Sequence, residues 1–273
     1  MRHILTLMLI LFTGHLFKSQ NLLVQYEYTK QKNKVDTTRI KGLYFLNIAG
    51  SESLFFSQAQ YVADSIIASD RRLGKKTDFK KLPNDLLESF VKKNRDLKTT
   101  TFYSNGLIEN DFQYTESFNF NWKIATTRKK VLGYNATLAK TFYAGREYHA
   151  YFTEEIPISE GPYKFYGLPG LILEICDSEV LHCFKLSGMQ MGSTGKLVDL
   201  SGHKFIMTTR EKFIAVKKQN GENPMQRMYE LMSSTGITET TDKNGNIVDI
   251  RKLVEKTQKS LQERYKKFNE IEL

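Results

Sequence analysis

Apolar and polar residues alternate with a period of two along many short segments of the chain. Residues 22–30 alternate in this way, and residues 39–49 and 52–57 follow as two further strand candidates. Successive side chains of a strand point to opposite faces, so the alternation indicates a sheet with one buried face. Four or five further runs of strand character lie between residues 98 and 153, separated by turn residues such as Asn105-Gly106.

A second group of segments has apolar residues at three- and four-residue steps, which is typical of amphipathic helices. Helices are predicted over five ranges: residues 58–73, 82–93, 209–218, 223–232 and 248–268. We expect the last and longest to pack on the sheet through Leu253, Leu261 and Tyr265. Its opposite face is rich in lysine, so a position at a membrane surface is the alternative.

Many consecutive strands followed by helices predict an α+β fold. The expected architecture is a large, curved, mainly antiparallel β-sheet, shaped like half a barrel and covered by helices, with an amphipathic helix at the C-terminus. Residues 98–187 are expected to form consecutive antiparallel strands of this sheet. About 250 residues fit one large β-rich domain, so we expect a single domain over residues 21–273.

The first twenty residues have the pattern of a secretory signal peptide. Arg2 supplies a positive charge, and residues 4–12 form an unbroken apolar run. Nine apolar residues are too few to cross a bilayer, which takes about 20. We therefore expect cleavage near Ser19 or Gln20, and a periplasmic or secreted protein that does not span the membrane.

The chain is basic, with 40 Lys and Arg against 30 Asp and Glu and a net charge of +10. Removal of Arg2 and Lys18 with the leader leaves 38 basic residues and a net charge of about +8. An exported protein meets anionic lipid headgroups and acidic partner loops, and we expect no nucleic-acid partner. No run of five basic residues exists, so scattered solvated lysines are the simpler interpretation.

The two cysteines, Cys176 and Cys183, fall on the arms of a predicted hairpin. An oxidising compartment permits a disulfide between them. Both lie on one face, either opposite or diagonal to each other, and the diagonal arrangement places the Cα atoms too far apart for easy bridging. Two cysteines and His182 are too few ligands for a zinc site, and the sequence predicts neither a metal nor a cofactor.

Residues 148–177 hold the densest set of special backbone positions in the chain. Gly161-Pro162 and Pro169-Gly170 are turn signals, and Gly167 can adopt conformations that other residues resist. These residues predict an ordered loop. Its apolar and aromatic side chains, together with one on the preceding strand, are the candidate binding residues: Tyr163, Phe165, Tyr166, Leu168 and Tyr151. A purely structural crossing under the core is the alternative.

This segment resembles the GLPGLI family of exported Bacteroidetes proteins, whose name stands here as Gly167-Leu168-Pro169-Gly170-Leu171-Ile172. The resemblance extends over effectively the whole chain after the leader. Its further motif residues, which we expect to be structural, are Trp122, Gly133, Tyr134, Arg146, Gly161 and Pro162. Two positions depart from the family pattern: Ala136 stands where the family often has Cys, and Tyr151 where it often has Trp.

The resemblance implies an envelope protein of Gram-negative bacteria, in a family often encoded near outer-membrane receptor genes. No catalytic motif accompanies it. We therefore expect a non-enzymatic periplasmic binding or assembly factor that acts with an outer-membrane receptor or an apolar ligand. An unrecognised periplasmic hydrolase is the alternative, with residues drawn from His149, Glu154, Glu155 and Ser159.

Overall fold

A computed structural model describes residues 21–32, 36–104, 111–192, 198, 200, 203–242, 244–267 and 271. The predicted leader and the Asn105-Gly106 turn lie outside these residues.

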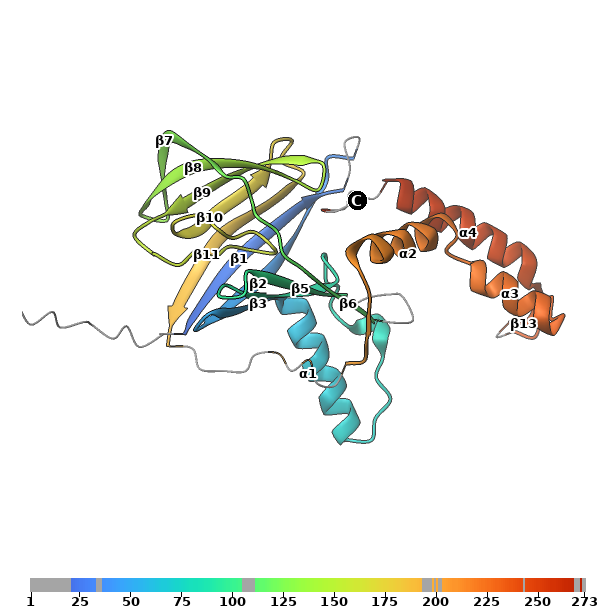
Figure 1. Cartoon of the computed structure of the whole chain (residues 1–273). Coiled ribbons are helices and arrows are strands. Elements are labelled where there is room, and N and C mark those ends of the chain that lie inside the picture. The colour runs from blue at the N-terminus through green and yellow to red at the C-terminus, as the bar shows by residue number, and fades with distance from the viewer. Residues whose placement is uncertain are drawn as a thin grey trace, which may run out of the picture.

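Twelve strands form one sheet, which curves around a common interior without closing (Figure 1). The strands are β1 Leu22–Gln31, β2 Arg39–Ala49, β3 Glu52–Ser57, β4 Ser89–Asn94, β5 Thr99–Ser104, β6 Asp111–Glu116, β7 Lys123–Val131, β8 Tyr134–Tyr143, β9 Arg146–Thr153, β10 Leu171–Asp177, β11 His182–Met191 and β12 Phe205–Met207. Their order is β12-β6-β5-β4-β3-β2-β1-β11-β10-β9-β8-β7, and every pair except β12 with β6 is antiparallel. The large, mainly antiparallel sheet is therefore confirmed.

The first strand of the sequence lies in the middle of the sheet. β1 pairs with β2 on one side and β11 on the other, so the chain after β6 must return to the far edge to begin β7. The prediction that residues 98–187 form consecutive neighbours is confirmed for β5–β6 and for β7 through β11. It is wrong between β6 and β7, because β1 already occupies the centre and pairs on both sides.

The two faces of the sheet have different environments. Along β1, the alternate residues Leu22, Val24, Tyr26 and Tyr28 are buried, and their neighbours are partly exposed. The outer face carries ion pairs between strands: Lys129 of β7 pairs with Glu174 of β10 at 3.0 Å, and Lys41 of β2 with Glu27 of β1 at 2.8 Å. This arrangement suits a face in contact with water, so the apolar core lies on the inner side.

The first helix, α1 Gln58–Arg72, packs on the outer face of β2 and β3, where Phe45 and Phe56 meet. It is followed by a short 3₁₀ turn, η1 Phe79–Lys81. The prediction of a helix over residues 82–93 is wrong, because most of the second half of this range forms β4. Val91 of β4 faces Phe55 of β3 and Phe102 of β5, so pairing on both sides outweighs the local helical spacing.

The C-terminal helices form an arm beside the sheet (Figure 1). The helical arm comprises α2 Arg210–Glu222, α3 Gln226–Thr235, the hairpin of β13 Glu239–Thr241 and β14 Ile247–Asp249, and α4 Ile250–Lys267. Phe213 anchors its base against Phe102 and Tyr114, with ring centroids 5.3 and 5.6 Å away. Ile271, beyond α4, is buried in the same core.

The predicted cover of helices over the sheet is therefore wrong for the C-terminal helix. α4 packs on α2 and on the β13–β14 hairpin. Val254 faces inward, whereas Leu253 is 51% exposed. Tyr265 contacts α2 so closely that a Cβ atom on Gly221 would lie 2.3 Å from its ring. Among the helices in the described part of the chain, none is long and apolar enough to cross a bilayer.

A buried carboxyl group lies beside the interior of the sheet. The Tyr44 hydroxyl donates to Asp85 Oδ1 at 2.6 Å, and the Leu87 N–H donates to the same atom at 3.2 Å. Burial raises the pKa of Asp85 above its ordinary value of 3.8, although these hydrogen bonds oppose the rise. The folded protein therefore binds this proton more tightly than the unfolded chain does.

This raised pKa predicts how stability depends on pH. As pH rises from 3.8 through the raised pKa of Asp85, its contribution to the free energy of unfolding should fall, because the folded state then carries a buried charge. Asp85→Asn keeps an accepting oxygen and cannot titrate. Urea unfolding should show the variant gaining stability relative to the original protein between about pH 4 and pH 7. If the difference in free energy of unfolding between the variant and the original protein is the same at about pH 4 and about pH 7, the prediction is wrong.

Candidate functional site

The segment between β9 and β10, residues 154–170, lies inside the curved sheet and is called the inner loop here. Its side chains Glu160, Tyr163, Phe165 and Leu168 are buried. The Ile172 N–H donates to the Glu160 carbonyl at 2.9 Å, and the Leu171 N–H donates to the Ile156 carbonyl at 3.0 Å. The predicted burial of the loop's aromatic and apolar residues is thus confirmed.

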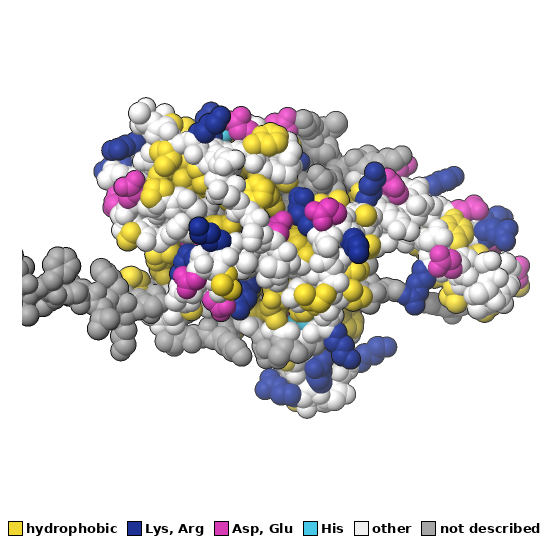
Figure 2. All heavy atoms as spheres, in the orientation of Figure 1, with side chains coloured by type: hydrophobic (Ala, Val, Ile, Leu, Met, Phe, Trp, Pro, Cys, Tyr) yellow, Lys and Arg dark blue, Asp and Glu magenta, His cyan; other side chains and the backbone are white. Residues whose placement is uncertain are grey.

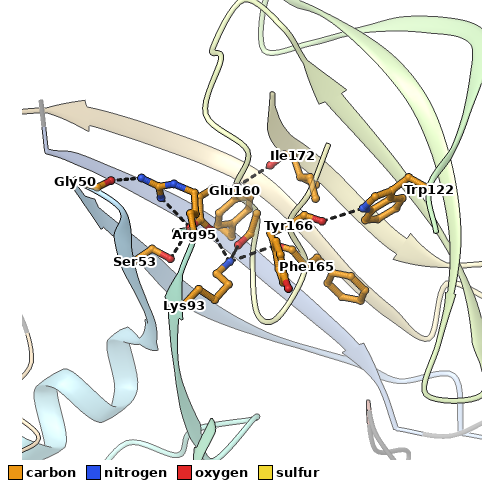
Figure 3. Close-up of polar contacts among 11 residues, drawn as sticks. Gly50, Ser53, Lys93, Arg95, Trp122, Glu160, Phe165, Tyr166 and Ile172 are labelled. Carbon is orange, nitrogen blue, oxygen red and sulfur yellow. Dashed lines mark hydrogen bonds and ion pairs between the residues drawn. The ribbon is translucent and has the colours of Figure 1, made fainter. Parts of the chain in front are cut away.

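Glu160 is the centre of a buried polar cluster (Figure 3). Its Oε2 atom lies 2.6 Å from Lys93 Nζ, and its Oε1 atom lies 2.9 Å from Arg95 Nη1. The Ser53 hydroxyl donates to Oε1 at 2.8 Å. These partners come from β3, from β4 and from the residue after β4, so the carboxylate joins the inner loop to one half of the sheet.

The ammonium group of Lys93 has three contacts with the inner loop. Besides Glu160, it donates to the Gly161 carbonyl at 2.7 Å and to the Phe165 carbonyl at 3.2 Å. Burial lowers the pKa of Lys93, and the charge of Glu160 opposes this effect. The buried ammonium therefore has two hydrogen bonds and an ion pair, and pairing of this kind allows a charge to remain inside a protein.

Tyr26 of β1 closes the other side of this cluster. Its hydroxyl donates to the Ile172 carbonyl at 2.7 Å. Burial, and in second place the negative charge of Glu160, raises the pKa of Tyr26 well above 10.0. The hydroxyl therefore stays protonated and can act as a hydrogen-bond donor throughout the physiological pH range.

In a second ion pair, the inner loop contributes the basic residue instead of the acidic one. Lys164 of the inner loop donates to Glu116 Oε1 at 2.7 Å and to the Tyr114 hydroxyl at 2.8 Å. Its Nζ atom lies 4.9 Å from the centre of the Phe102 ring and 4.8 Å from that of Tyr114. The loop thus contributes an acid to one pair and a base to the other.

The backbone after Lys164 is held by Trp122. The indole Nε1–H donates to the Tyr166 carbonyl at 2.8 Å (Figure 3), and the Tyr166 hydroxyl donates to the Phe118 carbonyl. The next residue, Gly167, has φ +96° and lies against the Trp122 ring. A residue with a side chain is strained in that conformation.

Gly161 and Gly170 are needed for a different reason, which is lack of space. A Cβ atom on Gly170 would lie 2.0 Å from the Thr153 carbonyl oxygen, and one on Gly161 would lie 2.7 Å from Ile172 Cδ1. Gly170 places the start of β10 against the end of β9. The motif glycines therefore serve two purposes, conformational freedom at Gly167 and close packing at Gly161 and Gly170.

The other motif residues occupy the opposite half of the sheet. Arg146 Nη1 lies 3.1 Å from Asp177 Oδ2, and Asp177 Oδ1 accepts the His182 N–H at 2.8 Å. Gly133, with φ +91°, forms the turn before Tyr134 and β8. Cys176 and Cys183 stand directly opposite in β10 and β11 and are joined as a disulfide.

The candidate binding residues do not form one surface. Tyr163, Phe165 and Leu168 pack in the interior, and Tyr166 is partly exposed beside them. Tyr151 lies on the outer face, where Lys129 Nζ is 3.7 Å from its ring centre. The buried side chains can reach a ligand only if the inner loop moves.

The residues of the hydrolase alternative are also held apart. His149 Nε2 lies 2.7 Å from Glu147 Oε1 on the outer face, and Glu155 Oε1 accepts the Asn135 N–H at 2.8 Å. Glu154 is exposed beside it. Within the described residues, no three His, Cys, Asp or Glu side chains form a group that could hold a metal ion.

The polar cluster was missed by sequence reasoning. Glu160 and Lys164 did leave a signal, because each is a charged residue inside a segment of aromatic residues, Gly and Pro. Lys93 left none, because it is the last residue of the helix predicted over residues 82–93. Its position two residues after Val91 on the inner face of β4 depends on strand pairing.

Comparison with known proteins gives a partial family match and a similar fold. A family model described as a protein of unknown function (Porph_ging) matches residues 140–174, which include the end of β8, β9, the inner loop and the start of β10. No curated protein matches the chain.

Two solved structures, both of PNGF-II, are similar to this chain in fold. The structure in space group P21 has a TM-score of 0.50 at 12% identity, with 72% of this chain and 33% of that chain covered. The structure in space group C2 has a TM-score of 0.51 at 13% identity, with 74% and 34% covered. The chain thus spans about a third of the length of the structures it matches.

A third structure has a much weaker likeness. It is a domain from Vibrio parahaemolyticus with a provisional assignment as an outer membrane lipoprotein-sorting protein. Its TM-score is 0.24 at 8% identity, with 64% of this chain and 87% of that chain covered, and it carries no argument about fold or function.

The buried ion pair predicts a large effect of neutralising Glu160. Glu160→Gln leaves Lys93 charged and buried, and should lower the free energy of unfolding by about 3–5 kcal/mol. Glu154→Gln, at an exposed carboxyl group, should change it by less than about 0.5 kcal/mol. Chemical denaturation measures both. The prediction fails if the two variants are equally stable, because Glu160 would then contribute no more than a surface carboxylate.

The close approach at Gly170 predicts a second effect. Gly170→Ala forces the new Cβ atom against the Thr153 carbonyl, and should destabilise the protein by about 1–3 kcal/mol. Gly188→Ala in β11 is the matched control, because its Cβ atom would meet Gln25 at an ordinary 3.6 Å. Thermal melts that are indistinguishable for the two variants would show that β9 and β10 can separate without cost.

Proposed function

We propose that this protein is an exported envelope factor that acts by binding: a non-enzymatic periplasmic binding or assembly factor whose partner is an outer-membrane receptor or an apolar ligand. The observation that carries the proposal is the surface of the helical arm. Beyond its base at Phe213, the arm buries the apolar side chains of Met232 and Val254. Its exposed apolar residues are more numerous: Met228, Leu231, Ile237, Ile247 and Leu253.

Such a surface is costly in an isolated protein. A helical segment is stabilised mainly by burying one apolar face, and this arm leaves large apolar side chains in water on α3, β14 and α4. Several exposed apolar residues on one projecting part of a protein are typical of an interaction site. The arm is attached to a rigid sheet through Phe213 and Ile271, so it can present this site in a defined position.

The filled interior of the sheet favours a partner that binds to the arm rather than an apolar ligand that binds inside the sheet. The inner loop already fills the interior with Tyr163, Phe165 and Leu168. A ligand in their place must break the Lys93–Glu160 pair, which costs several kcal/mol. We therefore favour the receptor over the apolar ligand, and the arm over the loop as the place of binding.

Membership of the GLPGLI family is part of the proposal. The match at residues 140–174 includes the motif that names the family, and the glycines of that motif have defined roles in placing the inner loop. The leader pattern supports export to the periplasm or beyond. The burial of Phe213 and Ile271 in the main core supports a single domain over residues 21–273.

Site-specific crosslinking in the envelope of the source bacterium tests the proposal. A photoreactive side chain at Leu231 should give a discrete adduct with an outer-membrane receptor, and Met228→Asp in the same chain should abolish it. The same group at Leu97, which is 69% exposed between β4 and β5, is the control and should give no such adduct. Adducts that are absent at Leu231, or equal at both positions, would refute a receptor-binding arm.

A further inference from the structure

Helix α4 carries an unbalanced positive charge. Its 18 residues include seven Lys and Arg and two Asp and Glu, a net charge of +5. Lys252, Lys256 and Lys259 are exposed and follow one another at steps of four and three residues, so they share one face of the helix. Lys252 Nζ lies 3.7 Å from Asp249 Oδ2, whereas in the part of the chain that the structure describes no carboxylate lies within ion-pair distance of Lys256 or Lys259.

An exposed apolar side chain borders this basic face. Leu253 stands three residues before Lys256 and directly after Lys252, and half of its surface is in water. On α3, Met228 and Leu231 are three residues apart and also exposed, so they share a face. Figure 2 shows Lys, Arg and hydrophobic side chains on the side of the arm that is in view, with some Asp and Glu side chains among them.

We propose that this side of the arm docks on the surface of an anionic lipid bilayer. The inference deepens the proposed function, on which it rests, because it states where an envelope factor of this kind is held. Lysines would meet the headgroups, and Leu253 with Met228 and Leu231 would enter the boundary between headgroups and acyl chains. The attachment is peripheral and reversible, since it uses a few side chains and no spanning helix.

Charge and the distribution of apolar residues favour a lipid surface over other occupants. A second copy of the chain would bring one α4 with a net charge of +5 against another, which is repulsive. Two of the exposed apolar residues lie on α3, and the others lie on α4, on β14 and between α3 and β13. A deformable bilayer accepts apolar side chains from several elements at once.

Vesicle cosedimentation of the purified protein tests the inference. Vesicles of phosphatidylglycerol and phosphatidylcholine should bind the protein, and vesicles of phosphatidylcholine alone should not. Replacing Lys252, Lys256 and Lys259 by Gln should weaken binding on the order of a hundredfold, since each lysine near an anionic surface raises the affinity by about fivefold and the three factors multiply. Binding should also weaken as salt is added.

The sheet offers a control with the same number of charges. Lys123, Arg128 and Lys130 of β7 are exposed, and none has a carboxylate within ion-pair distance among the described residues. Replacing these three by Gln removes the same net charge and should weaken vesicle binding by less than about threefold. Leu253→Gln should weaken it by about three- to tenfold, and Leu97→Gln should leave it unchanged.

Three outcomes would overturn the inference: no binding to anionic vesicles, equal binding to neutral vesicles, or equal losses from the α4 and β7 triple variants. Circular dichroism melts of every variant show whether a loss reflects unfolding. Crosslinking to a receptor without vesicle binding would leave the proposed function standing and remove the lipid surface. Vesicle binding without any receptor adduct would support docking on the lipid surface and remove the receptor-binding arm.

Discussion

The structure depends on one buried interaction, the ion pair between Glu160 of the inner loop and Lys93 of β4. Neither side chain has appreciable contact with water, so each charge requires the other. Lys93 also donates to the Gly161 and Phe165 carbonyls, and Glu160 also accepts from Ser53 and Arg95. The pair therefore fixes the backbone of the loop as well as its charge, and joins β9–β10 to β3–β4 across the interior.

The second pair, Lys164 with Glu116, makes this arrangement specific. Because the loop contributes a base here and an acid at Glu160, a loop inserted in the wrong register would place like charges together. Gly161 and Gly170 then allow the loop to approach its neighbours to distances that a Cβ atom would prevent. The interior is thus a filled scaffold, and the helical arm leaves five large apolar side chains exposed.

Local patterns in the sequence predicted much of the sheet and of the inner loop. The alternation in β1 and the glycines and prolines around Gly167 are local signals, and each was interpreted correctly. What failed depended on pairing between distant segments. Residues 82–93 have helical spacing, but residues 89–94 form β4 between two strands, so the inward position of Lys93 was missed. The prediction of how α4 packs failed for a similar reason. An amphipathic pattern shows that one face of a helix is buried, but it does not show which element covers that face.

Hydrogen exchange of the inner loop tests the central claim most directly. If the Lys93–Glu160 pair makes loop and sheet one cooperative unit, the N–H groups of Phe165, Leu171 and Ile172 should exchange only through global unfolding. Their free energies of exchange should then match those of Val24 and Tyr26 in central β1. Exchange of the loop amides by local opening, well before the amides of β1, would contradict the account.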